Sequence, residues 1–306
     1  MTTISDPTRR EFLTQLSSAG AALACLPSLP FQDILPRRPI PTTGEELPIV
    51  GLGSTKPVLE ILTEGMEPIR SVLRALLAGG GRIVDTAPRT EAIDAEFGGI
   101  LGEPWLAQMF LATKINATGR DAGVEQMRQT QRLFQRRQMD LVQIESLTDL
   151  TTQWTNLRDW KETGEARYIG VTVSSDELHE RLAGFMQRES PDFVHVNYSV
   201  METAAEDRIL PLAQDLRIAV LTNRPFMNGS YFGRVRGQPL PEWVGAFDCR
   251  SWAQFSLKYI LAHPAVTCAL AETTNPQHMS ENLQAGVGRL PSADHTRRMR
   301  ALIGAM

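Results

Sequence analysis

Three charged residues of this chain each stand at the end of a short apolar run. Asp85 closes the run 82–84, Lys114 follows 109–113, and Glu145 follows 141–144. Such runs are typical of buried strands, and a charged residue at the end of each one indicates a shared rim. An aspartate, a lysine and a glutamate at one rim could move protons to and from a bound molecule. They are therefore the first candidates for a catalytic site.

The elements that must hold these residues alternate regularly along the chain. Amphipathic, helix-like stretches separate eight apolar segments, predicted as strands at residues 49–53, 82–85, 109–113, 141–144, 168–173, 193–197, 219–222 and 266–270. Eight strands, each followed by helical material, predict an α/β fold, and this length favours a closed, parallel (β/α)8 TIM barrel over an open sheet. In such a barrel the carboxyl ends of all strands, and hence the three charged residues, face one mouth.

The segment Asp85-Thr-Ala-Pro-Arg-Thr90, with Lys114 and Glu145, resembles the catalytic pattern of the aldo/keto reductases. That family has an aspartate, a tyrosine, a lysine and a histidine at these places. Thr90 stands where the tyrosine is expected, and Glu145 stands where the histidine is expected. The stretch from Lys161 to Thr172 is also similar to the family's Gly-Lys-Val-Arg-Tyr-Ile-Gly-Val-Ser. The resemblance covers roughly residues 45 to 290 and implies nicotinamide-dependent reduction of a carbonyl or oxidation of an alcohol.

The resemblance assigns catalytic roles to Asp85, Lys114, Glu145 and, at the tyrosine position, Thr90. A lysine beside a carboxylate keeps its charge, so Lys114 could polarise a carbonyl group. A threonine hydroxyl is a weaker acid than a phenol and is too short to reach the same point. Thr90 therefore cannot replace the usual proton donor directly. Glu145 in an enclosed pocket could be kept protonated by desolvation and then donate a hydrogen bond.

A second set of positions is implied by the resemblance to hold the cofactor. Near the nicotinamide these are Thr172, His195, Asn223 and Arg224, and near the adenosine they are Thr273, Thr274, Asn275, His278, Glu281 and Asn282. A helix that begins in the latter segment could receive a phosphate at its N-terminus. The cofactor is NADP or NAD, and only the family resemblance favours NADP. His278 replaces a frequent arginine and Glu272 replaces a frequent lysine or glycine, which weakens the case for a 2′-phosphate.

The N-terminal residues 1–30 have the features of an export signal. Arg9 and Arg10 precede Phe12, a mildly apolar segment and small residues, a pattern that resembles the twin-arginine signal. It implies the twin-arginine export machinery as a partner and a periplasmic or extracytoplasmic location. Cleavage after Ala24 and lipidation at Cys25 are both open, and an ordinary amphipathic helix is the alternative interpretation. Residues 31–46 are predicted as a linker and 47–306 as the barrel.

Composition excludes several classes of partner. The net charge of −4 and the lack of a basic face argue against a nucleic-acid partner. The apolar part of the N-terminal segment is too short for a stable membrane span. Five scattered histidines and three cysteines show no metal-ligand spacing. We expect a monomer that acts on a small carbonyl compound and holds no metal.

Two other hypotheses remain open from the sequence. The barrel could have lost its activity and act as a nucleotide- or ligand-binding protein, with Asp85, Lys114 and Glu145 as structural ion-pair residues. Alternatively, Glu145 and Lys114 could carry lyase or isomerase chemistry without a nucleotide. The substrate is not indicated, because specificity lies in the variable loops after the strands. One such loop, at residues 229–248, contains four aromatic residues that could cover the mouth.

Overall fold

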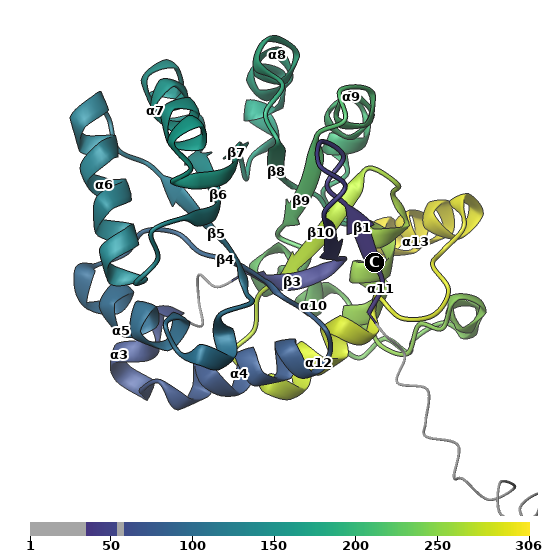
Figure 1. Cartoon of the computed structure of the whole chain (residues 1–306). Coiled ribbons are helices and arrows are strands. Elements are labelled where there is room, and N and C mark those ends of the chain that lie inside the picture. Colours follow the sequence, from purple (N-terminus) through teal and green to yellow (C-terminus); the bar gives the residue numbers. More distant parts are fainter. Residues whose placement is uncertain (1–34, 54–57) are drawn as a thin grey trace, which may run out of the picture. The chain divides into compact units, whose positions relative to one another are not determined.

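A computed structural model describes residues 35–53 and 58–306 of the chain (Figure 1). The chain divides into two units, residues 1–33 and 34–306, of which the second contains all the elements described below. The predicted signal segment 1–30 and the first residues of the predicted linker lie outside the described residues.

Eight parallel strands close into a barrel in the order β10-β3-β4-β5-β6-β7-β8-β9 (Figure 1). They are β3 (Val50–Gly53), β4 (Ile83–Asp85), β5 (Phe110–Ile115), β6 (Met139–Glu145), β7 (Ala166–Thr172), β8 (Phe193–Asn197), β9 (Ala219–Asn223) and β10 (Val266–Ala271). Each of them overlaps one predicted strand, and the segment 193–197 agrees at both ends. The predicted (β/α)8 TIM barrel is therefore confirmed.

Helices alternate with the strands and form the outer layer. They are α3 (Ile61–Glu64), α4 (Glu67–Ala78), α5 (Glu91–Leu101), α6 (Arg120–Leu133), α7 (Leu150–Thr163), α8 (His179–Glu189), α9 (Ile209–Asp215), α10 (Ser230–Arg234), α11 (Trp252–Ala262), α12 (Pro276–Gln284) and α13 (Ala293–Ala305). Within the described residues, no helix combines the length and the apolar character needed to cross a membrane.

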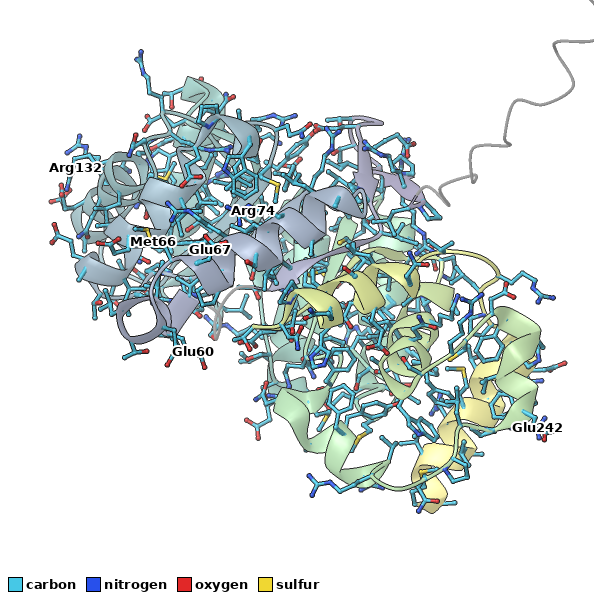
Figure 2. All side chains as sticks on the ribbon, turned by 90° about the horizontal axis from the view of Figure 1, so that it is seen from below. Glu60, Met66, Glu67, Arg74, Arg132 and Glu242 are labelled. Atoms are coloured by element: carbon cyan, nitrogen blue, oxygen red, sulfur yellow. The ribbon has the colours of Figure 1, made fainter. Side chains whose placement is uncertain are left out.

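Helix α4 shows why these segments become helices with one buried face. Its buried residues Ile69, Val72, Leu73 and Leu76 follow the spacing of one helical face. The opposite, exposed face carries an ion pair between Glu67 and Arg74, which lie along α4 in Figure 2. The helix ends at Gly79, whose N–H donates to the Ala75 carbonyl. The apolar face thus turns α4 toward the barrel core and leaves the charges in water.

The interior of the barrel changes from apolar to polar along its axis. Near the start of the strands, Ile83, Phe110, Leu141 and Phe193 belong to one buried apolar cluster. Side chains two residues further along a strand point the same way, because successive residues of a strand alternate between its faces. On four strands these next inward positions hold polar or small residues, namely Asp85, Ala112, Gln143 and His195. The strand sequences themselves therefore place the polar groups above an apolar floor.

A short hairpin closes the floor of the barrel and corrects the predicted linker. Strands β1 (Arg37–Pro39) and β2 (Glu46–Pro48) pair antiparallel. Ile40 and Leu47 are buried in the same cluster as the apolar side chains inside the barrel. The structure thus differs from a linker over most of residues 31–46. Two strands of three residues each give no readable periodicity, which is why the sequence pattern did not reveal them.

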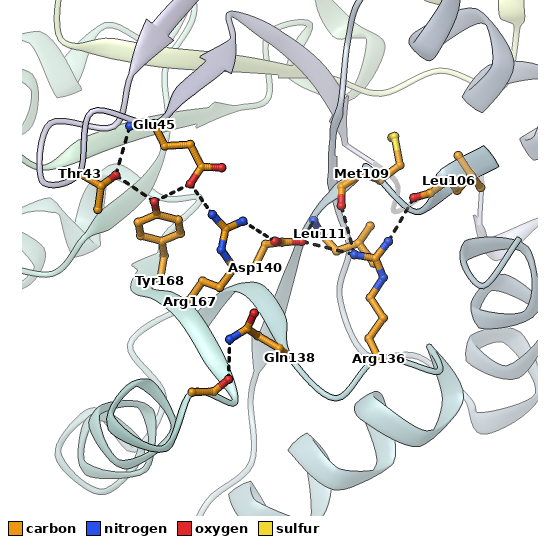
Figure 3. Close-up of polar contacts among 11 residues, drawn as sticks. Thr43, Glu45, Leu106, Met109, Leu111, Arg136, Gln138, Asp140, Arg167 and Tyr168 are labelled. Atoms are coloured by element: carbon orange, nitrogen blue, oxygen red, sulfur yellow. Dashed lines mark hydrogen bonds and ion pairs between the residues drawn. The ribbon is translucent and has the colours of Figure 1, made fainter. Parts of the chain in front are cut away.

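A line of polar contacts fastens the hairpin to the strands above it (Figure 3). The Tyr168 hydroxyl lies 2.7 Å from Glu45 Oε2 and 2.9 Å from Thr43 Oγ1. Arg167 pairs with Glu45 and, at 2.7 Å, with Asp140. Asp140 Oδ2 in turn accepts a hydrogen bond from the Leu111 backbone N–H at 2.9 Å. The network ties the hairpin to β5, β6 and β7 at the end of the barrel opposite the mouth.

If the hairpin is part of the core, truncating its buried side chain must destabilise the barrel. We expect Ile40→Ala to lower the free energy of unfolding by about 2–5 kcal/mol, because it leaves a cavity under the strands. Thr42→Ala, at an exposed hairpin position, should change it by less than about 0.5 kcal/mol. Urea unfolding of both variants measures the difference. Equal, small effects would show that the hairpin is not packed as described.

Candidate active site

Asp85 and Lys114 form a buried ion pair on neighbouring strands. Lys114 Nζ lies 2.5 Å from Asp85 Oδ2, and each side chain is 8% exposed. The ammonium also donates to the Thr86 carbonyl at 2.8 Å, and Gln143 Nε2 donates to Asp85 Oδ1 at 3.1 Å. Both charges are therefore hydrogen-bonded as well as paired, which buried ions require. The predicted pairing of Asp85 with Lys114 is present in the structure.

His195 lies beside this pair, although the sequence placed it only near the cofactor. It is 2% exposed, and its Nδ1 is 3.9 Å from Asp85 Oδ1. Burial lowers the pKa of His195 to about 4, the Asp85 carboxylate opposes that change, and the Lys114 ammonium adds to it. The imidazole is consequently neutral at pH 7. Two strands as far apart in sequence as β4 and β8 are brought together only by closure of the barrel.

Glu145 lies one inward position nearer to the mouth than Gln143 on β6. It is half-buried, and its Oε2 accepts a hydrogen bond from Asn116 Nδ2 at 3.1 Å. In the described part of the chain, its hydrogen bond goes to Asn116 and not to Asp85 or Lys114. Glu145 therefore stands at the rim, where it can meet a molecule that lies over the ion pair.

Thr90 has a different role from the tyrosine whose place it takes. It is the N-cap residue of α5, with an exposed side chain whose Oγ1 accepts from the Ile93 backbone N–H at 3.5 Å. Threonine is a favoured residue at this position because its hydroxyl satisfies one of the free N–H groups of the first turn. The structure thus explains Thr90 as a helix cap.

The sequence interpretation missed Arg89, the residue before Thr90. Its side chain is 5% exposed, and Nη1 donates to Thr86 Oγ1 and to the Ala87 carbonyl, both at 2.7 Å. Burial lowers the pKa of Arg89, while Asp94, Asp85, Glu272 and Glu145 act against that change. The guanidinium thus stands among the carboxylates of the mouth. Its place inside the Asp85–Thr90 motif was the available signal.

Two adjoining cavities lie beside the mouth, and most predicted cofactor residues line them. The first, of about 670 Å³, is lined among others by Asn223, Arg224, Thr273 and Thr274. The second, of about 330 Å³, is lined among others by Thr273, His278, Glu281 and Asn282. Phe226, Phe232, Glu272 and Thr273 border both cavities. The shared residues make the cavities one continuous groove from the barrel mouth to α12.

Three predicted cofactor residues do not line the groove. Thr172 is buried at the end of β7, opposite His195 on β8. Asn275 caps α12, where its side chain accepts from the Gln277 N–H at 2.8 Å. His195 lies within the barrel, as described above. Asn223, which lines the larger cavity, donates a hydrogen bond from Nδ2 to the Val173 carbonyl at 3.0 Å.

The lining of the groove fits a nicotinamide dinucleotide. Its mixture of aromatic and polar side chains suits a nucleotide. The smaller cavity, however, is bordered by the carboxylates Glu272 and Glu281, and its lining among the described residues includes no lysine or arginine. A phosphate there would meet negative charge without a matching cation.

Comparison with known proteins agrees with this geometry. The sequence pattern of the aldo/keto reductase family matches residues 66–302. An NADH-specific methylglyoxal reductase of Escherichia coli (strain K12) is 25% identical over an alignment of 168 residues, and the match covers 46% of this chain. The chain spans about half, 50%, of that curated relative's length.

Solved structures of the same kind share the fold. An aldo-keto reductase from Bacillus halodurans in its holo form has a TM-score of 0.69 at 19% identity, covering 88% of this chain and 96% of that one. A Bombyx mori aldo-keto reductase in complex with NADP has a TM-score of 0.67 at 18% identity, with coverage of 88% and 92%. A Klebsiella pneumoniae aldo/keto reductase in complex with NADP and acetate has a TM-score of 0.67 at 19% identity, with coverage of 85% and 93%.

Substitution of Thr90 distinguishes a role as the N-cap of α5 from a role in catalysis. We expect Thr90→Ala to lower the free energy of unfolding by about 1 kcal/mol, because the first turn of α5 loses its acceptor. Thr90→Ser keeps the acceptor and should stay within about 0.5 kcal/mol of the parent protein. Thermal or urea unfolding measures both. Unchanged stability in Thr90→Ala would contradict the capping role.

Proposed function

This chain belongs to the aldo/keto reductase family, and on that premise we propose that it is a nicotinamide-dependent oxidoreductase that interconverts a small carbonyl compound and its alcohol. The observation that carries the proposal is the buried Asp85–Lys114 pair at the barrel mouth, together with two cavities beside the mouth that most of the expected cofactor residues line. The methylglyoxal reductase of Escherichia coli makes small aldehydes and ketones the first substrates to test.

In this proposal the bound nicotinamide supplies or accepts a hydride, and residues of the chain manage the carbonyl oxygen. Lys114 presents a positive charge at the floor of the mouth, where negative charge develops on that oxygen. Asp85 keeps the ammonium in place, and Gln143 holds the second oxygen of the Asp85 carboxylate. Glu145 orients the substrate by a hydrogen bond at the rim, next to Asn116.

We propose NAD(H) rather than NADP(H) as the cofactor. The family resemblance by itself favours NADP, and the Bombyx mori and Klebsiella pneumoniae structures contain it. The smaller cavity of this chain has two carboxylates at its border, and neither lysine nor arginine belongs to its lining among the residues described. The Escherichia coli relative is NADH-specific, which agrees with this choice.

A second candidate function is a barrel that binds a nucleotide or another ligand without turning it over. Thr90 favours it, because the place of the family's phenol is taken by a helix cap. The two functions differ in one measurable respect. A binding protein would take up the nucleotide and still give no product with any aldehyde or ketone.

We also propose that residues 1–30 are a twin-arginine signal that directs the chain out of the cytoplasm, and that the mature protein is a monomer. The support is the pair Arg9-Arg10 followed by Phe12 and small residues. Fractionation of cells that produce the full chain, with Arg9→Lys/Arg10→Lys as control, tests the export route. Retention of both forms in the cytoplasm would contradict it.

Nucleotide preference tests the proposed cofactor. Titration followed by nucleotide fluorescence should show NADH binding at least about tenfold more tightly than NADPH, about 1.4 kcal/mol. His278→Arg should tighten NADPH binding about tenfold and leave NADH nearly unchanged, because it adds a cation at the smaller cavity. Gln277→Arg, at an exposed neighbouring position that does not line this cavity, is the matched control. Binding of neither nucleotide would refute the oxidoreductase proposal.

Substitution of the central cation tests the chemistry. We expect Lys114→Met to reduce kcat for a small aldehyde at least about a hundredfold while nucleotide binding remains. Glu145→Gln keeps a hydrogen-bonding group at the rim, so it should raise KM more than it lowers kcat. Steady-state kinetics with both variants measures the two effects. Undiminished turnover in Lys114→Met would show that another group acts on the carbonyl.

A further inference from the structure

The imidazole of His195 is a buried polar group whose hydrogen-bonding capacity is unused. Neither Nδ1 nor Nε2 has a hydrogen-bond partner among the described residues. A neutral imidazole carries one donor and one acceptor, and each such buried group left unsatisfied costs about 1–3 kcal/mol. Buried polar groups without partners are rare in native structures, so the two ring nitrogens of His195 call for an explanation.

Asp85 is the group that His195 can reach with a small movement. Nδ1 lies 3.9 Å from Asp85 Oδ1, about 1 Å beyond an N–H···O hydrogen bond. That oxygen already accepts from Gln143, whereas Oδ2 accepts from Lys114. The imidazole therefore stands on the side of the carboxylate that the ammonium does not occupy.

The charges around this group come from several elements. Asp85 on β4 and Lys114 on β5 act directly on His195. Arg89 after β4 interacts electrostatically with Asp85, with Glu145 on β6 and with Glu272 after β10. His195 itself is neutral, so it can donate from Nδ1 without adding a charge.

If Lys114 transfers a proton, the Asp85 carboxylate loses its charged partner and needs another hydrogen-bond donor, such as the Nδ1–H of His195. Two contacts of the Lys114 ammonium go to Asp85 and to the Thr86 carbonyl, and a lysine carries three N–H groups. The third can be given to a carbonyl oxygen. Once it has left, the Asp85 carboxylate faces a neutral amine within the protein interior, where a charge is stabilised chiefly by hydrogen bonds.

We propose that His195 is a positioning residue for this transfer, and that its Nδ1–H closes onto Asp85 Oδ1 while Lys114 Nζ gives its proton to the substrate's carbonyl oxygen. The inference rests on the proposed oxidoreductase function. A bound reduced nicotinamide would supply the hydride and Lys114 the proton that together convert the carbonyl to the alcohol, and the nicotinamide would be left oxidised. Lys114 regains a proton from water at the mouth, and Asp85 and His195 keep their charge states throughout.

The contact between His195 and Asp85 can be tested without cofactor or substrate. NMR titration of the ring of His195, assigned with His195→Gln, should show that Lys114→Met raises the pKa of His195 from about 4 by at least about one unit. The reason is that the ammonium is gone and the carboxylate then favours the imidazolium. Lys114→Met/Asp85→Asn, the matched control, should reverse this rise. An unchanged titration in Lys114→Met would overturn the proposal.

Steady-state kinetics tests whether His195 supports the proton transfer from Lys114. His195→Gln keeps an N–H donor and should hold kcat within about threefold, whereas His195→Leu should lower kcat at least about tenfold with little change in KM. Equal kcat in all three proteins, or equal losses in both variants, would overturn the proposal.

If the parent protein binds no nucleotide, the proposed oxidoreductase function fails. The NMR experiment still decides whether the pKa of His195 responds to the ion pair.

Discussion

The buried ion pair between Asp85 and Lys114 is the interaction on which the arrangement of the barrel mouth depends. Two ions taken out of water are tolerated only when they neutralise each other and when their remaining hydrogen-bonding positions are filled. The barrel meets these conditions from three strands and one loop carbonyl, with Gln143 and Thr86 completing the contacts. Removal of either charge leaves the other one stranded, at a cost of about 3–5 kcal/mol. A buried, hydrogen-bonded ion pair at a barrel mouth is therefore a candidate for a functional site.

The barrel isolates this pair from water on every side except the mouth. Apolar residues fill the space below it, and the hairpin with Ile40 and Leu47 closes the far end. Contacts of Tyr168 and Arg167 with Glu45 keep that hairpin against the strands. The charges consequently act in a medium of low polarity, where an ammonium polarises a carbonyl far more strongly than it would in water.

The sequence predicted the barrel and the ion pair well, because both depend on local patterns. Apolar runs that end in Asp85 and Lys114 are readable without knowledge of neighbouring strands. The closeness of His195 to Asp85 could not be predicted in the same way, since it depends on how the strands are staggered around the closed sheet. Thr90 was assigned by its spacing in the family pattern, although a threonine just before a helix is also a cap signal. The sequence pattern thus predicted where the strands lie along the chain. The closure of the barrel determines which side chains from different strands come into contact.

The central proposal is that Lys114 and Asp85 carry out the reductase chemistry although Thr90 stands at the position of the family's tyrosine. Its most direct measurement is the transfer of deuterium from labelled NADH to a panel of small aldehydes and ketones, followed by mass spectrometry of the alcohol products. The account predicts that the parent protein places deuterium on the carbonyl carbon of at least one product and that Lys114→Met does not. No transfer by the parent protein to any of these compounds, or equal transfer by both proteins, would contradict it.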